Sequence, residues 1–92
     1  MTFFEVYDLW LEEHKAEVKQ TTFATYRYAR KTFAKVIDED ADICSLDEAK
    51  MREVTERFRE FNMGSRYRSD LMMVFRMVMR YAAQNLGIGN LQ

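Results

Sequence analysis

The sequence predicts an all-α domain of four helices, and three observations support that fold class. The 92 residues include no proline and only three glycines, so few positions would interrupt a helix. Apolar residues recur at three- and four-residue spacing in four separate stretches, whereas the alternation typical of β-strands recurs nowhere. The hydrophobic content of 48% is ample for one core. We therefore expect residues 1–92 to fold as a single domain.

The first helix is expected to start after Thr2, because Thr2 and Glu5 have the spacing of a capping box. The opposite side of this helix carries Glu5, Asp8 and Glu12, so that surface would repel a polyanion. The stripe that would be buried is Phe3, Val6, Tyr7, Trp10, His14 and Val18.

The second helix is expected to take Thr22 as its N-cap. Its predicted buried stripe is Phe23, Tyr26, Phe33, Val36 and Ile37. Arg27, Lys31 and Lys35 follow one another at four-residue spacing on the other side. Such a row is either an ordinary solvated surface or a contact for phosphate. Arg30 lies nearer the stripe, where its aliphatic stem would pack.

Residues 38–42 include four acids and predict a loop. The third helix would follow it and run through about Phe61, capped either by Ser45 together with Glu48 or by Asp47 alone. Its predicted buried stripe is Met51, Val54, Phe58 and Phe61.

The fourth helix is expected to run from a Ser65 cap to about Leu86, with Gly87 as a left-handed C-terminal cap. Its predicted buried stripe is Tyr67, Leu71, Val74, Phe75, Val78, Tyr81 and Ala82. The far side carries Arg66, Ser69, Met73, Arg76 and Arg80.

Charge is sorted by segment, although the formal net charge is only -1. Residues 18–37 hold five basic side chains and no acidic one, and Asp70 is the only acid from Ser65 to Gln92. Two basic helices in a near-neutral chain are typical of a protein that holds a polyanion. We expect the basic rows of the second and fourth helices to be two halves of one surface.

Composition argues against several other classes. Cys44 is the only cysteine and cannot form an internal disulfide, which favours the reducing cytoplasm. The N-terminus is charged by Glu5, and no apolar run has the length of a membrane span, so we expect neither a signal peptide nor a membrane partner. His14 is the only histidine and falls on a buried stripe, so we expect no metal, no cofactor and no catalytic cluster.

Several segments resemble one known family in order and spacing. They are Thr2–Leu11, Thr22–Tyr26, Leu46–Ala49, and Ser65–Tyr67 followed by Val74-Phe75, Tyr81-Ala82 and Gly87–Asn90. Along its whole length the chain resembles the N-terminal core-binding (SAM-like) domain of phage-type tyrosine recombinases, the integrases. Leu91 departs from the family, which commonly has proline after the asparagine. The resemblance implies a four-helix, SAM-like orthogonal bundle.

The resemblance also implies a function. In such recombinases the catalytic residues lie in a following domain, so this chain would be a fragment or a stand-alone remnant and would not cut DNA itself. The junction would lie near residues 87–92. The chain would grip the core site on double-stranded DNA through its second and fourth helices, as half of a clamp that the catalytic domain closes, and protomers could touch on the DNA.

The candidate DNA-binding residues are Lys19, Gln20, Thr21, Thr22, Thr25, Arg27, Lys31, Lys35, Ser65, Arg66, Ser69, Arg76 and Arg80. Whether the arginines contact bases or only phosphates stays open at this point. The alternative function is a helical protein-interaction module that uses an exposed face with Met73 and Met77 and does not bind DNA.

Overall fold

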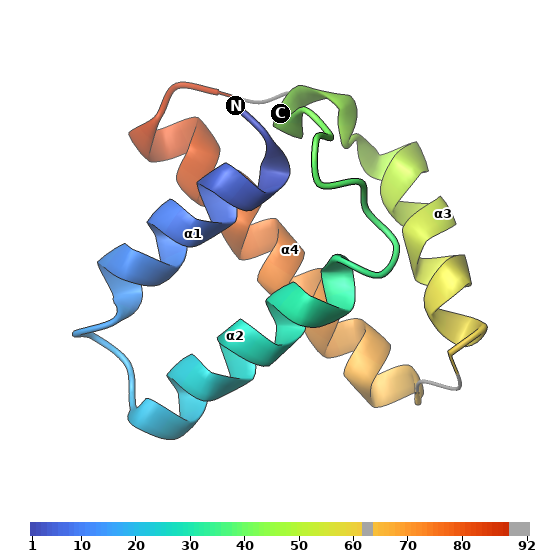
Figure 1. Ribbon diagram of the computed structural model, residues 1–92, viewed down its shortest axis with the longest axis horizontal. Helices are drawn as coiled ribbons and strands as arrows, with labels where there is room; N and C mark the ends of the chain where they lie inside the picture. The colour runs from blue at the N-terminus through green and yellow to red at the C-terminus, as the bar shows by residue number, and fades with distance from the viewer. Residues whose placement is uncertain (62–63, 89–92) are drawn as a thin grey trace.

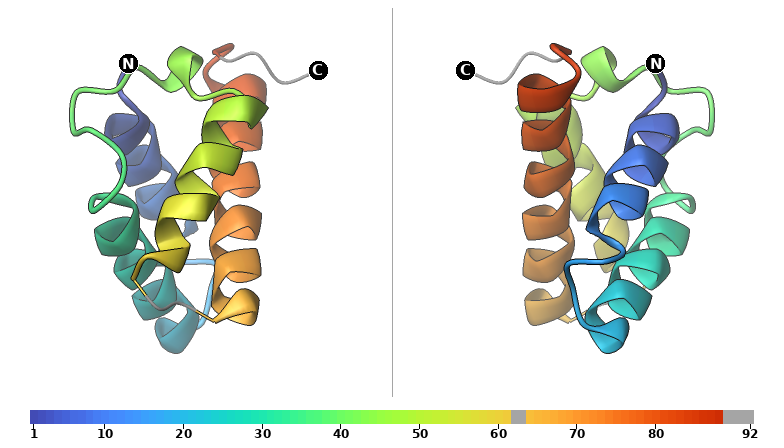
Figure 2. Two further views of the ribbon diagram at one scale, coloured as in Figure 1. Left: turned by 90° about the vertical axis from the view of Figure 1, so that its right-hand side faces the viewer. Right: turned by 90° about the vertical axis from the view of Figure 1, so that its left-hand side faces the viewer.

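Four α-helices and one short 3₁₀ helix make up the chain in the computed structural model, which describes residues 1–61 and 64–88 (Figure 1). They are α1 (Phe3–His14), α2 (Gln20–Phe33), the 3₁₀ helix η1 (Ile43–Ser45), α3 (Glu48–Arg59) and α4 (Ser65–Asn85). In Figure 1, α1 and α2 lie in front, α4 crosses behind them, and α3 lies to one side, and the two side views of Figure 2 agree. The predicted all-α fold of four helices is confirmed.

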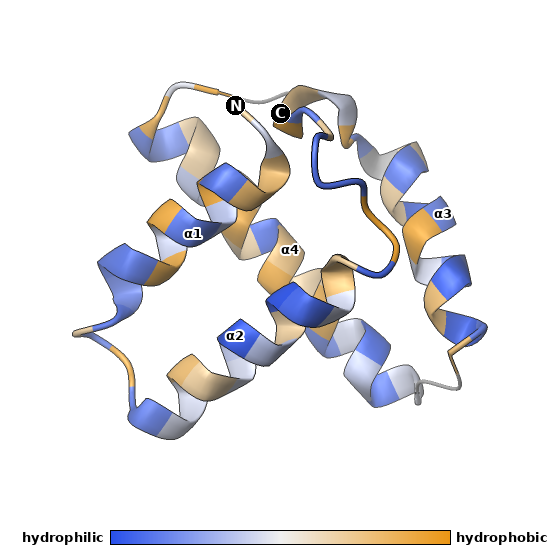
Figure 3. Ribbon diagram, viewed as in Figure 1, coloured by the Kyte–Doolittle hydropathy of each residue, from blue (hydrophilic) through white to orange (hydrophobic). Residues whose placement is uncertain are grey.

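An aromatic cluster joins the four helices. The ring centroid of Phe3 in α1 lies 5.6 Å from that of Phe33 in α2 and 5.7 Å from that of Phe75 in α4. Phe58 of α3 lies 5.9 Å from Phe33, and all four side chains are buried. Hydrophobic and hydrophilic residues interchange along each helix in Figure 3, because each helix gives one side to the common core.

Thr2 caps α1 as predicted. The Glu5 N–H donates to the Thr2 hydroxyl oxygen at 3.1 Å, and the Thr2 N–H donates to the Glu5 carboxylate at 3.0 Å. The bond from the Thr2 backbone favours the charged carboxylate and lowers the pKa of Glu5 below its usual value. The helix ends at His14, so Val18, the last residue of the predicted stripe, lies in the connection to α2.

The start of α2 differs from the prediction. Lys19 has extended backbone and is the N-cap, so the predicted cap Thr22 lies inside the first turn. The Phe23 N–H donates to the Lys19 carbonyl at 2.9 Å, so the acceptor of the first helical hydrogen bond lies three residues before Thr22. This early start is possible because the connection after α1 has already reversed the chain direction (Figure 1). At the other end, Val36 and Ile37 are buried as predicted but lie beyond the helix end.

The acidic segment 38–42 is a loop, as predicted, and it is held to the N-terminus. The Phe3 N–H donates to the Ala41 carbonyl at 3.0 Å, and the Ile43 N–H donates to the Met1 carbonyl at 2.9 Å. Asp42 ends the loop by accepting the Cys44 N–H at 2.8 Å, which caps η1. The loop therefore has a fixed attachment beside the start of α1.

Asp47 alone caps α3, by accepting the Lys50 N–H at 2.9 Å, and this was one of the two predicted alternatives. The helix ends at Arg59. Phe61 consequently lies beyond the helix and is 44% exposed, so its predicted burial is wrong.

The cap predicted for α4 is also wrong. Gly64 has extended backbone and occupies the N-cap position, which makes Ser65 the first helical residue. The C-terminal end agrees with the prediction, since Gly87 has a φ of 63° in the left-handed region. Met79 is buried although the predicted stripe omitted it.

Tyr7 gives the fold a pH dependence above neutrality. Its side chain is buried and its hydroxyl donates to the Tyr26 carbonyl at 2.7 Å, and burial raises the pKa of Tyr7 well above the usual value near 10. The unfolded chain then ionises Tyr7 at lower pH than the native state does. We expect the free energy of unfolding to fall from about pH 10 upward, by at most about 1.4 kcal/mol per pH unit from this group.

Urea titrations at pH 8, 10 and 11 would measure this fall. Tyr7→Phe should be destabilised by about 1 kcal/mol at pH 8 through the lost hydrogen bond, and should show a shallower fall than the wild type above pH 10. The exposed Tyr28→Phe is the matched control and should follow the wild-type curve. Equal slopes for Tyr7→Phe and wild type would contradict the assignment.

Candidate nucleic-acid interface

The outer side of α2 carries unpaired cations. Arg27 and Lys31 are exposed and lie on the side of the helix opposite the buried Ala29 and Phe33. Within the described part of the chain, neither forms an ion pair. Lys35 is exposed too, but it follows the end of the helix, and its ammonium lies 5.9 Å from the centre of the Phe61 ring.

Arg30 has a different role from the other cations of α2. Its guanidinium donates to both carboxylate oxygens of Asp8, at 2.7 and 3.1 Å, and lies 4.9 Å from the centre of the Phe4 ring. These contacts attach α2 to α1, and they fit the prediction that Arg30 packs beside the core. The row available to a ligand is therefore Arg27 and Lys31, without Arg30.

The N-termini of α2 and α4 lack side-chain caps, unlike those of α1 and α3. The first intrahelical bonds are donated by Phe23 in α2 and by Arg68 in α4. The N–H groups before them have no intrahelical acceptor, and neither first turn contains an acid. Because helix N-termini carry partial positive charge, both ends are suited to phosphate.

These two helix starts lie at one end of the molecule, the lower end in Figures 1 and 2. We call this end the basal surface and define it by the exposed residues of the two N-caps and first turns, together with Thr25 and Ser69, which lie one turn after Thr21 and Ser65. Its members are Lys19, Gln20, Thr21, Thr25, Gly64, Ser65, Arg66 and Ser69. Thr22 is half-buried, and the Thr25 hydroxyl donates to the Thr21 carbonyl at 3.0 Å.

The outer side of α4 continues away from the basal surface. Arg66, Ser69, Met73, Arg76 and Arg80 are all exposed, opposite the buried Leu71 and Val78. Arg66 and Arg80 are separated by about 21 Å along the helix axis. No described carboxylate pairs with any of the three arginines.

The two basic rows do not form the single surface that the sequence predicted. Helices α2 and α4 lie on opposite sides of the core (Figure 2), and each row lies on the side of its helix that faces away from the core. The rows therefore point away from each other. A sequence predicts which residues lie on the outer side of each helix, but not how the helices pack against one another. Helices α2 and α4 contribute to a common surface only at the basal surface.

Arg68 was not among the predicted site residues. It is half-buried near the start of α4, and its Nε is buried without a hydrogen-bond acceptor among the described residues. Helical spacing places Arg68 beside the buried stripe of α4, so a search of the outer side of the helix does not select it. Its position one turn from Gly64 adds a cation close to the basal surface.

The predicted methionine face is not present. Met73 is 51% exposed, whereas Met77 is half-buried against the core and lines a cavity of about 220 Å³ with Trp10 and His14. The Nδ1 atom of His14 lies 3.0 Å from the Trp10 carbonyl oxygen, so His14 has the structural role that the sequence predicted. Met77 is turned towards the flank of α4 that meets α1, so Met73 has no exposed methionine partner there.

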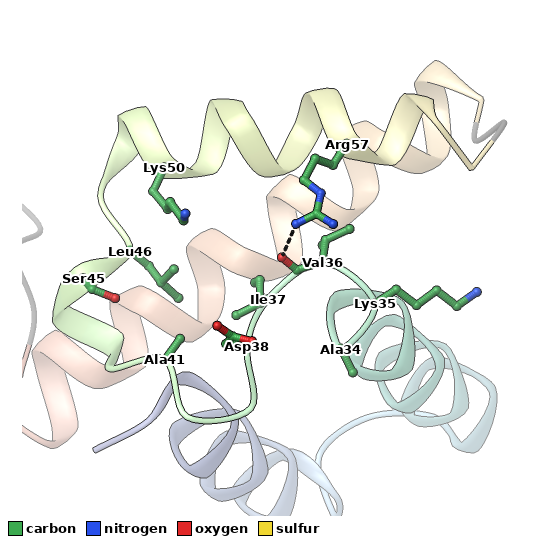
Figure 4. Close-up of a pocket in the computed structure, with 10 residues that line it drawn as sticks. All are labelled: Ala34, Lys35, Val36, Ile37, Asp38, Ala41, Ser45, Leu46, Lys50 and Arg57. Atoms are coloured by element: carbon green, nitrogen blue, oxygen red, sulfur yellow. Dashed lines mark hydrogen bonds between the residues drawn. The ribbon is translucent and has the colours of Figure 1, made fainter.

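A second cavity, of about 470 Å³, lies between α3 and the segment 34–46 (Figure 4). The Lys50 side chain points into it and that of Lys35 points away, while Arg57 donates to the Val36 carbonyl at 3.4 Å. The hydroxyl of Ser45 donates to the Asp42 carbonyl at 2.6 Å. Among the described residues that line this cavity, no group is arranged for nucleophilic or acid–base catalysis.

Two searches of the described residues were negative. They contain no group of three histidine, cysteine, aspartate or glutamate side chains that could hold a metal ion. No helix in residues 1–61 and 64–88 is both long and apolar enough to cross a membrane.

Comparison with known proteins finds a match to one family over part of the chain. Residues 2–35 match the family described as phage integrase, N-terminal SAM-like domain. This stretch contains α1, the connection and α2, including Arg27 and Lys31. No match was found among curated proteins or among solved structures. The match supports the predicted resemblance to the N-terminal SAM-like domain of phage integrases over α1 and α2.

Proposed function

We propose that this chain is the DNA-binding domain of a tyrosine site-specific recombinase and that it grips the core recombination site as half of a clamp. The observation that carries the proposal is the pair of uncapped helix N-termini at the basal surface, with Arg66 within it and Arg27 and Lys31 beside it. None of these three cations has an ion-pair partner among the described residues. Backbone N–H groups and unpaired cations together are the groups that hold DNA phosphates.

The distribution of acids supports the same orientation. Glu5 is exposed in the first turn of α1, and the acidic loop 38–42 is attached to the start of α1. In Figure 1 the start of α1 lies at the upper end, away from the basal surface. A duplex against the basal surface would thus meet cations and helix N-termini, while this acidic region stays clear of it.

The candidate residues are expected to contribute unequally. Lys19, Gln20, Thr21, Thr25, Ser65, Arg66 and Ser69 would contact the duplex at the basal surface. Arg27 and Lys31 would extend the contact along α2. Thr22 is half-buried and would act through its backbone. Lys35, Arg76 and Arg80 lie farther from the basal surface, so they would contribute only where the duplex bends towards them.

The remainder of the proposal concerns the larger assembly. The catalytic domain would follow a junction near residues 87–92, of which 89–92 lie outside the described residues. Catalysis would belong to that domain, and neighbouring protomers on the DNA would be further partners.

A titration of labelled duplex DNA at several salt concentrations tests the proposal. We expect weak binding at 50 mM salt, because half a clamp makes few phosphate contacts. The logarithm of the binding constant should fall with the logarithm of the salt concentration, with a slope of about -0.9 for each phosphate contact. Absence of binding at low salt, or binding that does not respond to salt, would refute the proposal.

A further inference from the structure

Tyr28 is an exposed aromatic residue within the cationic side of α2. Its side chain is 61% exposed, the highest value among the large hydrophobic residues that the structure describes. Its hydroxyl has no hydrogen-bond partner in residues 1–61 and 64–88. Its backbone carbonyl accepts a hydrogen bond from the Thr32 hydroxyl. Nothing in the described fold thus uses the ring.

The neighbours of Tyr28 on this side form a regular pattern. Ala24, Arg27, Tyr28 and Lys31 stand at positions i, i+3, i+4 and i+7, and all four are exposed. Residues at this spacing share one side of a helix and can contact the same partner. The pattern combines one small residue, one aromatic ring and two cations that form no ion pair with any described residue.

The major groove of DNA matches this combination. It admits an α-helix, and the thymine 5-methyl group is the apolar feature on its floor. Ala24 has no long side chain to keep the helix away from the base edges. Arg27 and Lys31 would hold the flanking phosphates, which leaves the Tyr28 ring directed at the groove between them. The burial of an otherwise exposed ring would favour this arrangement.

We propose that Tyr28 is a specificity-determining residue whose ring contacts a thymine methyl group in the major groove. The inference rests on the proposed DNA-binding function and deepens it, because it separates one base-contacting side chain from the cations that contact phosphate. It also assigns the outer side of α2 to sequence recognition.

Selection from a library of randomised duplexes would test this. The wild type should enrich a motif that contains thymine, and Tyr28→Ala should lose the preference at one or two base pairs while it keeps the salt dependence of the wild type. Tyr28→Phe should keep the preference, since the ring makes the contact. Phe61→Ala is the matched control, because it removes another exposed ring outside α2.

Replacing the selected thymine by uracil removes only the methyl group and should weaken wild-type binding about three- to fivefold. Tyr28→Ala should bind both duplexes equally. The inference is overturned if Tyr28→Ala enriches the wild-type motif, or if it loses affinity for all sequences to the same extent. Failure of the wild type to bind any duplex at low salt would instead refute the proposed function, and this result is obtained before any variant is compared.

Discussion

The double variant Arg27→Glu/Lys31→Glu should bind duplex DNA about 100-fold more weakly than the wild type at 50 mM salt, or more weakly still. Each substitution removes a charged contact worth about 1.5–3 kcal/mol and places a carboxylate against the phosphates. Both side chains are exposed, so the fold should persist. The like-charge pair at i, i+4 also remains, with its sign reversed, so its small cost to the helix is unchanged.

The matched control is Lys15→Glu/Arg52→Glu, which changes the net charge by the same amount. Lys15 follows α1 and Arg52 lies on α3, and both are exposed. This variant should lose affinity only modestly, through the general field of the protein. Equal losses in the two double variants would mean that net charge, and not the α2 row, governs binding.

A third variant separates the two basic rows. Arg76→Glu/Arg80→Glu changes two residues on the outer side of α4, beyond the basal surface. It should reduce the affinity for DNA less than Arg27→Glu/Lys31→Glu does. If it costs more, the far part of α4 is the main contact and the proposed orientation of the duplex is wrong. The same measurement addresses the protein-interaction alternative, which predicts that DNA binding is absent in every variant.

The helices could be predicted from the sequence because their periodicity reflects the core directly. Phe3, Phe33, Phe58 and Phe75 were all expected on buried stripes and are buried. Caps were predicted less well. Thr2 and Asp47 each directly precede the first helical residue, so they act as N-caps. Thr22 and Ser65 do not, because Lys19 and Gly64 before them already have the extended backbone of an N-cap.

The candidate site was predicted only in part, because a sequence defines the sides of single helices and not their packing. Exposure of Arg27, Lys31 and Arg66 follows from helical spacing. That α2 and α4 begin at one end of the molecule, while their outer sides diverge, depends on the crossing of α4 behind α1 and α2 (Figure 1). The uncapped N-termini could not be recognised either, since the sequence offers threonine or serine near both.

The substitution Phe33→Ala should lower the free energy of unfolding by about 3–5 kcal/mol. Phe33 is 0% exposed, and its ring lies 5.6 Å from Phe3, 6.1 Å from Tyr7 and 5.9 Å from Phe58, between centroids. The change therefore leaves a cavity where α1, α2 and α3 meet. A domain of this length has a total stability of about 5–14 kcal/mol, so the loss would be a large part of it.

Urea unfolding measures the effect, and Phe61→Ala is the control with the same chemical change at a side chain that is 44% exposed. Phe61→Ala should cost less than about 1 kcal/mol, and a similarly small cost for Phe33→Ala would show that the aromatic cluster does not hold the helices together. The variant also separates stability from recognition. Phe33→Ala should bind DNA in proportion to its folded fraction with an unchanged salt slope, whereas charge reversal on α2 should reduce that slope and leave unfolding unchanged.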